Sequence, residues 1–143
     1  MDDFDRFVED LQREIDERTH ALYSDKVLAE VSHPRNMGRM DAPDSHGRAQ
    51  SSCGDSMEMY LRLDGERIAE ATFITDGCSP TVASGSKLTT MVRGMSLAEA
   101  EALTPDDLLA ALDGLPAEHV HCAVLAVDTL HQALANRPTE TNP

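Results

Sequence analysis

The stretch from residue 53 to residue 78 constrains the fold most, because it has the pattern of a β-hairpin bounded by two cysteines. Apolar and polar residues alternate from 57 to 63, which is the period of a half-buried strand. β-branched and aromatic residues are frequent from 67 to 75, as in a second strand. Asp64-Gly65 separates the two strands, and this dipeptide predicts a two-residue type I′ turn.

This turn sets the register of the hairpin and brings chemically useful side chains together. A turn at Asp64-Gly65 places Cys53 opposite Asp76, with Cys78 just past the same end. Asp55 also lies at that end, and neighbouring strands are about 5 Å apart. The hairpin therefore predicts two thiols and a carboxylate close enough to share a metal ion.

The third cysteine, Cys122, lies in His119-Val120-His121-Cys122, at the start of the last predicted helix (120–136). Ser79-Pro80 has the form of an N-cap followed by a proline at the first helical position, which places Cys78 at another helix N-terminus. The positive end of a helix dipole favours a thiolate over a thiol. Both positions therefore predict deprotonated sulfur.

The candidate metal-binding set combines three thiols, one carboxylate and one imidazole, with a second imidazole as an additional ligand. The set is Cys53, Asp55, Cys78, His121 and Cys122, with His119 as the additional ligand. Three thiolates suit zinc, cuprous copper or an iron–sulfur cluster. Because a permanently held cluster normally has four cysteines, this set predicts a cluster that is bound and then released. The alternative is that each cysteine is a small buried hydrophobe, which the Ala-Val-Leu after Cys122 would fit.

The chain is strongly acidic, and this excludes several classes of function. Its 143 residues include 26 Asp and Glu against 12 Lys and Arg, for a net charge of −14. Since no Lys/Arg cluster is present, we expect no nucleic-acid binding and no binding to anionic membranes. The odd count of three cysteines argues against a disulfide framework. A reducing, cytoplasmic setting is the expected location.

Helices are predicted around the hairpin from apolar spacing and capping residues. The pattern from 3 to 22 predicts an amphipathic helix, and we expect this N-terminal extension (1–22) to pack onto the main domain (23–137). A third strand is expected near 48–51, and 138–143 is expected to be a disordered tail. Further helices are expected after Ser24, over 80–92, after Ser96 and after Thr104.

Short motifs along most of the chain carry a family resemblance. In order they are Tyr23-Ser24-Asp25-Lys26-Val27-Leu28, Pro34-Arg35-Asn36-Met37-Gly38, Cys53-Gly54-Asp55, Asp76-Gly77-Cys78, Ala83-Ser84-Gly85-Ser86, Gly94-Met95-Ser96-Leu97 and His121-Cys122-Ala123-Val124-Leu125-Ala126. With these motifs the chain resembles the IscU/NifU N-terminal family of iron–sulfur cluster assembly scaffold proteins, in its single-domain form. The resemblance implies an α+β fold: a three-stranded antiparallel sheet packed against helices, with an N-terminal and a C-terminal helix. It also implies cluster ligation by Cys53, Asp55, Cys78, His121 and Cys122.

The function that the resemblance implies is cluster assembly and transfer, without turnover catalysis. The protein would accept sulfur from a cysteine desulfurase, bind iron, build a labile 2Fe–2S cluster and pass it to apo-proteins. A homodimer and a release-assisting chaperone are further expected partners. The segment 115–119 departs from the Leu-Pro-Pro-Val-Lys that such a chaperone grips in the family, and it places His119 where a lysine is common.

Two other functions are alternatives. A zinc-binding sulfur acceptor, similar to the SufU role, would hold zinc through Asp55, Cys78 and Cys122 and accept sulfur on Cys53. Zinc is also the metal expected on the isolated protein. A cysteine hydrolase would pair His121 with Cys122, but adjacent helical residues point about 100° apart, which places the imidazole poorly to activate the thiol.

Overall fold

The computed structural model describes residues 2–138, and for residues 16–21 it describes the backbone alone. Over this part of the chain the elements are α1 (Asp3–Leu22), α2 (Asp25–Ser32), β1 (Ser45–Gln50), β2 (Ser56–Asp64), β3 (Arg67–Thr75), α3 (Ser79–Val92), α4 (Leu97–Glu101), α5 (Pro105–Ala111), the 3₁₀ turn η1 (Ala117–His119) and α6 (Val120–Ala135). The predicted helices are confirmed, including the capping boxes that open α4 and α5. The predicted disordered tail lies outside the described residues beyond Pro138.

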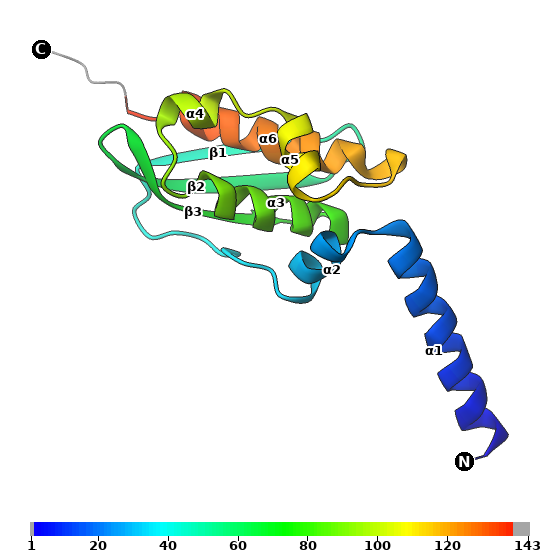
Figure 1. The fold of residues 1–143 in the computed structure, drawn as a ribbon. Helices are drawn as coiled ribbons and strands as arrows, with labels where there is room; N and C mark the ends of the chain where they lie inside the picture. The colour runs from blue at the N-terminus through cyan, green and yellow to red at the C-terminus, as the bar shows by residue number, and fades with distance from the viewer. Residues whose placement is uncertain (1, 139–143) are drawn as a thin grey trace, which may run out of the picture.

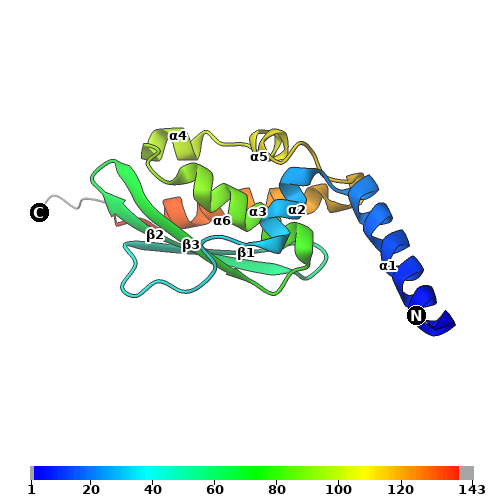
Figure 2. The same cartoon turned by 60° about the horizontal axis from the view of Figure 1, so that its bottom comes forward.

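The strands form one antiparallel sheet in the order β1-β2-β3, and the helices of the domain cover one face of it (Figures 1 and 2). Helix α6 packs on β1 and β2, and helix α3 packs on β3. This arrangement confirms the predicted α+β fold. The strand expected near 48–51 is β1, which begins earlier because its backbone pairs with β2 from Ser45, opposite Leu61, onward.

The hairpin register differs from the predicted one. Gly65-Glu66 forms the turn, and Asp64 pairs with Arg67. Of the two turn residues only the glycine has a positive φ, 60°, as in a type II′ turn with glycine first. A bulge between Arg62 and Leu63 then shifts the rest of the ladder. The predicted type I′ turn is therefore wrong, and Cys53 lies outside the ladder, on the turn between β1 and β2.

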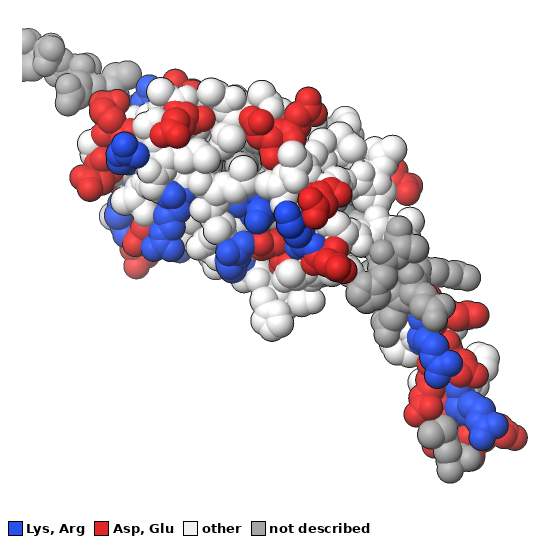
Figure 3. Space-filling model, in the orientation of Figure 1, with Lys and Arg blue, Asp and Glu red and all other residues white. Residues whose placement is uncertain are grey.

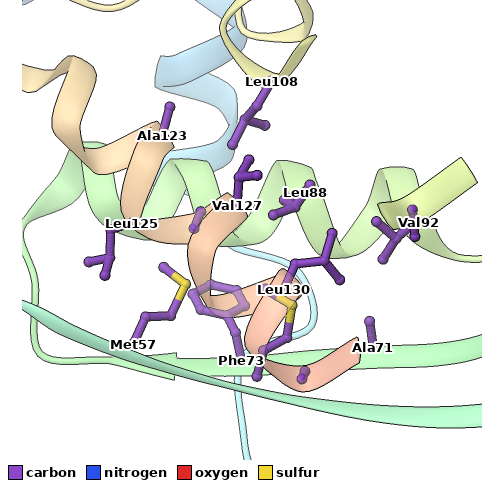
Figure 4. Close-up of a cluster of buried hydrophobic side chains, with 14 of the residues drawn as sticks. Met57, Ala71, Phe73, Leu88, Val92, Leu108, Ala123, Leu125, Val127 and Leu130 are labelled. Atoms are coloured by element: carbon purple, nitrogen blue, oxygen red, sulfur yellow. The ribbon is translucent and has the colours of Figure 1, made fainter. Parts of the chain in front are cut away.

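The core lies between the sheet and helices α3 and α6 (Figure 4). Phe73 of β3 points from the sheet toward α3, where a Cβ on Gly85 would come within 2.5 Å of the ring. The small residues of α3 therefore let the helix approach the sheet closely. This packing sets α3 and α6 side by side, so that both helices begin at the end of the sheet where β3 ends (Figure 1).

Helix α1 projects away from the domain (Figures 1 and 2). Its apolar residues are exposed, with Phe4 at 70%, Phe7 at 62% and Leu22 at 57%. The expectation that it packs onto the domain is therefore wrong. The physical reason lies in the short link between α1 and α2. Ser24 caps α2 and donates its hydroxyl to the Leu112 carbonyl, and these two contacts fix the direction in which the chain enters α2. None of the described helices is long and apolar enough to cross a membrane.

Candidate metal centre

Three donor atoms meet at the end of the sheet where α3 and α6 begin, on the right in Figure 1. The Cys78 Sγ, a ring nitrogen of His119 and the Cys122 Sγ all lie within 4.8 Å of one another. A tetrahedral zinc ion, with bonds of about 2.0–2.3 Å, holds such donors roughly 3.5–3.8 Å apart. The three side chains therefore lie close to coordinating geometry before any metal binds.

Cys78 is the N-cap residue of α3, and its thiol is exposed. The prediction assigned the cap to Ser79, but the helix begins one residue earlier. The backbone N–H groups of Thr81 and Val82 donate to the Cys78 carbonyl at 2.9 and 3.0 Å. The side chain of Cys78 itself makes no capping hydrogen bond, which leaves the sulfur available to a ligand beside the positive end of the helix.

Cys122 lies in the first turn of α6 and is buried. Burial raises the pKa of its thiol to about 11, although a hydrogen bond of 3.2 Å donated by the Thr81 hydroxyl acts in the opposite direction. The predicted deprotonated sulfur is therefore wrong for Cys122 in the metal-free chain, because desolvation outweighs the effect of the helix end. A bound cation would supply the positive charge that a buried thiolate needs.

His119 is the last residue of η1, and its Nδ1 atom is buried without a hydrogen-bond partner. Its ring tilts against those of Tyr23 and His121, at centroid distances of 6.1 and 6.3 Å. A buried ring nitrogen without a partner is uncommon and costs desolvation free energy. The imidazole and two sulfurs form a donor set that suits zinc or iron, and the geometry groups His119 with the two thiols ahead of the other predicted ligands.

The other predicted ligands lie around this group. The Nε2 atom of His121 is 3.7 Å from the Cys122 Sγ. Cys53 is exposed on the turn between β1 and β2, and Asp55 follows on the same turn, where Gly54 has a φ of 94°. The charge of the Asp55 carboxylate contributes to the raised pKa of Cys122, so this carboxylate is near enough to interact with the buried thiol. The structure thus brings Cys78, His119 and Cys122 together, with His121 and Asp55 close enough to interact with Cys122 and with Cys53 on the same turn as Asp55.

Two residues with no predicted role complete the site. The Thr81 hydroxyl lies 3.2 Å from the Cys122 Sγ and 3.9 Å from the Cys78 Sγ, so it bridges the two thiols. The signal for Thr81 in the sequence was its position three residues after Cys78, near the start of a predicted helix. Tyr23 lines a cavity of about 350 Å³ together with Cys78 and His119, and its other walls are Ser79, Pro80 and apolar side chains of α2. Burial, followed by the charges of Cys78 and Cys122, raises the pKa of Tyr23.

The exposure of the thiols predicts their order of reactivity toward iodoacetamide. In the native metal-free protein, Cys53 and Cys78 should be alkylated quickly and Cys122 slowly at about pH 8, because Cys122 is buried and its pKa is about 11. Its rate should rise about tenfold per pH unit above that, since the thiolate fraction grows until the pH reaches the pKa. Mass spectrometry of labelled peptides measures the three rates, with urea-unfolded protein as the control. Equal native rates for Cys122 and Cys53 would contradict this expectation.

The fold and the donor group define a small α+β domain with a thiol–imidazole metal-ligand set at one end of its sheet. Residues 22–142 match the model of the NifU-like N-terminal domain, and the chain belongs to this family. The family resemblance expected from the sequence motifs is thereby confirmed.

Three relatives illustrate the similarity. Over 116 residues the chain is 37% identical to the iron–sulfur cluster assembly scaffold protein IscU 1 of Archaeoglobus fulgidus, covering 80% of this chain and 76% of the relative. Over 119 residues it is 37% identical to the scaffold protein IscU of Escherichia coli K12, covering 80% and 92%. Over 111 residues it is 41% identical to the nitrogen fixation protein NifU of Cereibacter sphaeroides, covering 77% of this chain and 45% of that longer protein.

Two solved structures share the fold. A protein of Fervidobacterium islandicum AW-1, assigned to the SUF system as a cluster assembly scaffold, has a TM-score of 0.64 at 21% identity, covering 80% of this chain and 98% of that chain. An N-terminal NifU-like protein of Brucella abortus has a TM-score of 0.65 at 16% identity, covering 82% and 94%. At these identities the similarity shows the fold alone.

Proposed function

We propose that this chain is a scaffold on which an iron–sulfur cluster is assembled as cargo and from which the cluster is passed to apo-proteins. The observation that carries the proposal is the donor group, in which an exposed thiol, a buried thiol and an unpartnered imidazole lie within 4.8 Å of one another. The relatives in Archaeoglobus fulgidus and Escherichia coli are named as scaffolds for such clusters, and they cover most of this chain.

Cys53 is the proposed acceptor of sulfur from a cysteine desulfurase, because its thiol is exposed on a turn and lies outside the three-donor group. Its thiolate would attack the outer sulfur of the donor's persulfide. A new S–S bond forms on Cys53 while the donor's S–S bond breaks, and the donor cysteine leaves as a thiolate. Each transferred sulfur must then gain two electrons to become a bridging sulfide, so the assembly also needs an external reductant.

The cargo would be held by Cys78, Cys122 and His119, with a fourth contact from the side chains around them. Asp55 and His121 offer an oxygen and a nitrogen for that contact, and both are weaker partners for iron than a fourth thiolate. The mixed donor set therefore supports a cluster that is held for a time and then released. Ligand exchange at the exposed end of the sheet provides the route to an apo-protein.

The mixed nitrogen and sulfur donors also favour a second candidate function. Zinc is commonly bound by such sets in proteins, and Cys78, His119 and Cys122 supply three of its four ligands. This set differs from the zinc ligands expected from the sequence, because His119 takes the place of Asp55. In this function zinc would stay bound while Cys53 carries the accepted sulfur as a persulfide.

Anaerobic reconstitution tests the proposed function and separates it from the zinc alternative. The protein is incubated with a cysteine desulfurase, cysteine, ferrous iron and a thiol reductant. We expect visible absorbance at about 400 nm together with equal amounts of iron and acid-labile sulfide on the protein. Absence of the chromophore, together with persulfide on Cys53 and bound zinc in a parallel incubation that contains zinc and omits the thiol reductant, would support the zinc-bound acceptor. A protein that gains neither sulfide nor persulfide would contradict both functions.

A further inference from the structure

Helix α1 carries an apolar stripe that the domain does not cover. The stripe is made of Phe4, Phe7, Val8, Leu11 and Ile15, with Leu22 at the end of the helix, and each of these side chains is between 46% and 70% exposed. Their spacing places all six on one face of the helix. Exposed apolar side chains clustered in this way mark an interaction surface, unlike single exposed residues, which are ordinary.

The charges of α1 are arranged around this stripe. At 100° per residue, Asp5 lies on one side of the stripe, while Asp3 and Glu14 lie on the other. Arg6 and Arg13 lie on the face opposite the stripe. Figure 3 shows basic patches of this helix lying among acidic ones. The edges of the apolar surface are therefore acidic, and of the three arginines of α1, Arg6 and Arg13 lie opposite the stripe while the position of Arg18 falls on the stripe side.

This charge pattern selects between two kinds of occupant. A second copy of α1 packed face to face would bring acidic edges together, which is unfavourable. The whole chain carries a net charge of −14, so the same repulsion acts between complete molecules. A partner with an apolar groove bordered by Lys and Arg would match both the stripe and its edges, as in other complexes where a helix binds in a groove.

The position of α1 indicates where such a partner works. The helix ends at Leu22, and the next residue, Tyr23, lines the cavity beside Cys78 and His119. A protein that binds along α1 is therefore tethered to the chain at the end of the helix nearest the candidate metal centre, although the helix itself projects away from the domain (Figure 1). A cluster with two sulfides needs two separate sulfur deliveries, and a contact independent of the thiols keeps the donor near between them at a high effective concentration.

From these observations we infer that α1 is the docking helix for the sulfur-donating protein, whose binding groove is apolar and bordered by basic residues. The inference rests on the proposed function, because it takes the donor to be a cysteine desulfurase. It adds a binding surface outside the metal centre. It also gives the N-terminal helix a role. The helix is available for this role because it does not pack on the domain.

The test titrates the full-length protein with the cysteine desulfurase of the same organism by calorimetry. The variant Phe7→Ser/Leu11→Ser removes the centre of the stripe and should weaken binding by about tenfold or more. The matched control Arg6→Ser/Arg13→Ser changes the opposite face and should bind within about twofold of the wild type, or more tightly. Circular dichroism and the melting temperature check that both variants keep the folded domain, which α1 does not help to bury.

Salt dependence gives a second readout. Binding of the wild type should weaken as salt rises, and Asp5→Asn/Glu14→Gln should reduce that dependence, since these carboxylates face the basic border of the groove. Unchanged desulfurase affinity in Phe7→Ser/Leu11→Ser overturns the inference. The inference also fails if this variant disrupts a homodimer but still binds the desulfurase as the wild type does. If the wild type takes sulfur from the desulfurase while the stripe variant binds it equally well, only the inference fails. If the wild type takes no sulfur, the proposed function fails, and if it does not bind the desulfurase both fail.

Discussion

Replacing Cys78 with serine is expected to lower the affinity for Zn²⁺ by at least about a hundredfold, since loss of an outer-shell contact alone commonly costs 10–100-fold. The Cys78 Sγ is one of three donors that lie within 4.8 Å of one another, and its residue is exposed, so it is free of the burial that raises the pKa of Cys122. A serine hydroxyl at the same N-cap position keeps the helix start but offers zinc a poor ligand. Competition with a chromophoric chelator under anaerobic conditions measures the affinity.

Cys53→Ser is the matched control for this variant. Cys53 is also an exposed thiol, but it lies outside the three-donor group, so its replacement should leave zinc affinity within about threefold of the wild type. The same variant should lose the ability to accept persulfide sulfur, which mass spectrometry detects as a mass increase. Equal zinc binding by Cys78→Ser and the wild type would show that the three-donor group is not the metal centre.

Gly47→Ala is expected to lower the free energy of unfolding by about 2–4 kcal/mol, because it forces apart a backbone-to-backbone contact. A Cβ at residue 47 would lie 2.7 Å from the Ala133 Cα and from the Gln132 carbonyl carbon of α6. Backbone atoms cannot rotate away as a flexible side chain can, so β1 and α6 must separate. Hydrogen bonds hold them together on both sides, from Ser45 to the Ala133 carbonyl and from Asn136 to the His46 carbonyl.

Urea unfolding of the metal-free protein measures this loss as a lower midpoint at an unchanged slope. The neighbouring variant Arg48→Ala serves as the control, because this exposed side chain of β1 should cost less than about 0.5 kcal/mol. A stability equal to that of the wild type for Gly47→Ala would mean that β1 and α6 are less closely packed than described.

Local patterns in the sequence predicted most of the fold. Alternation from 57 to 63 identified β2, and the capping residues Ser96 and Thr104 located α4 and α5, because these signals depend on neighbours within a few residues. The turn was the exception. Leu63 donates its N–H to the Asp44 carboxylate at 2.7 Å, so the end of β2 is held by a residue from outside the hairpin, which the Asp64-Gly65 dipeptide could not indicate.

The candidate site was predicted in part. The hairpin placed Cys53 and Cys78 at the same end of the sheet, where the structure has both. His119 was an outer candidate, although the structure places it beside the two thiols, because η1 turns its ring inward. The protonation state of Cys122 was also beyond local patterns, since its pKa depends on which face of α6 is buried.

The sequence by itself determined the strands, the helices with their caps and the presence of thiols at element boundaries, since each depends on residues close together in the chain. Only the tertiary structure decided which donors meet, how deeply Cys122 is buried and that α1 stands free of the domain. The physical reason is that distance, desolvation and packing depend on how α6 and α3 lie against the sheet, and these contacts join residues far apart in the sequence.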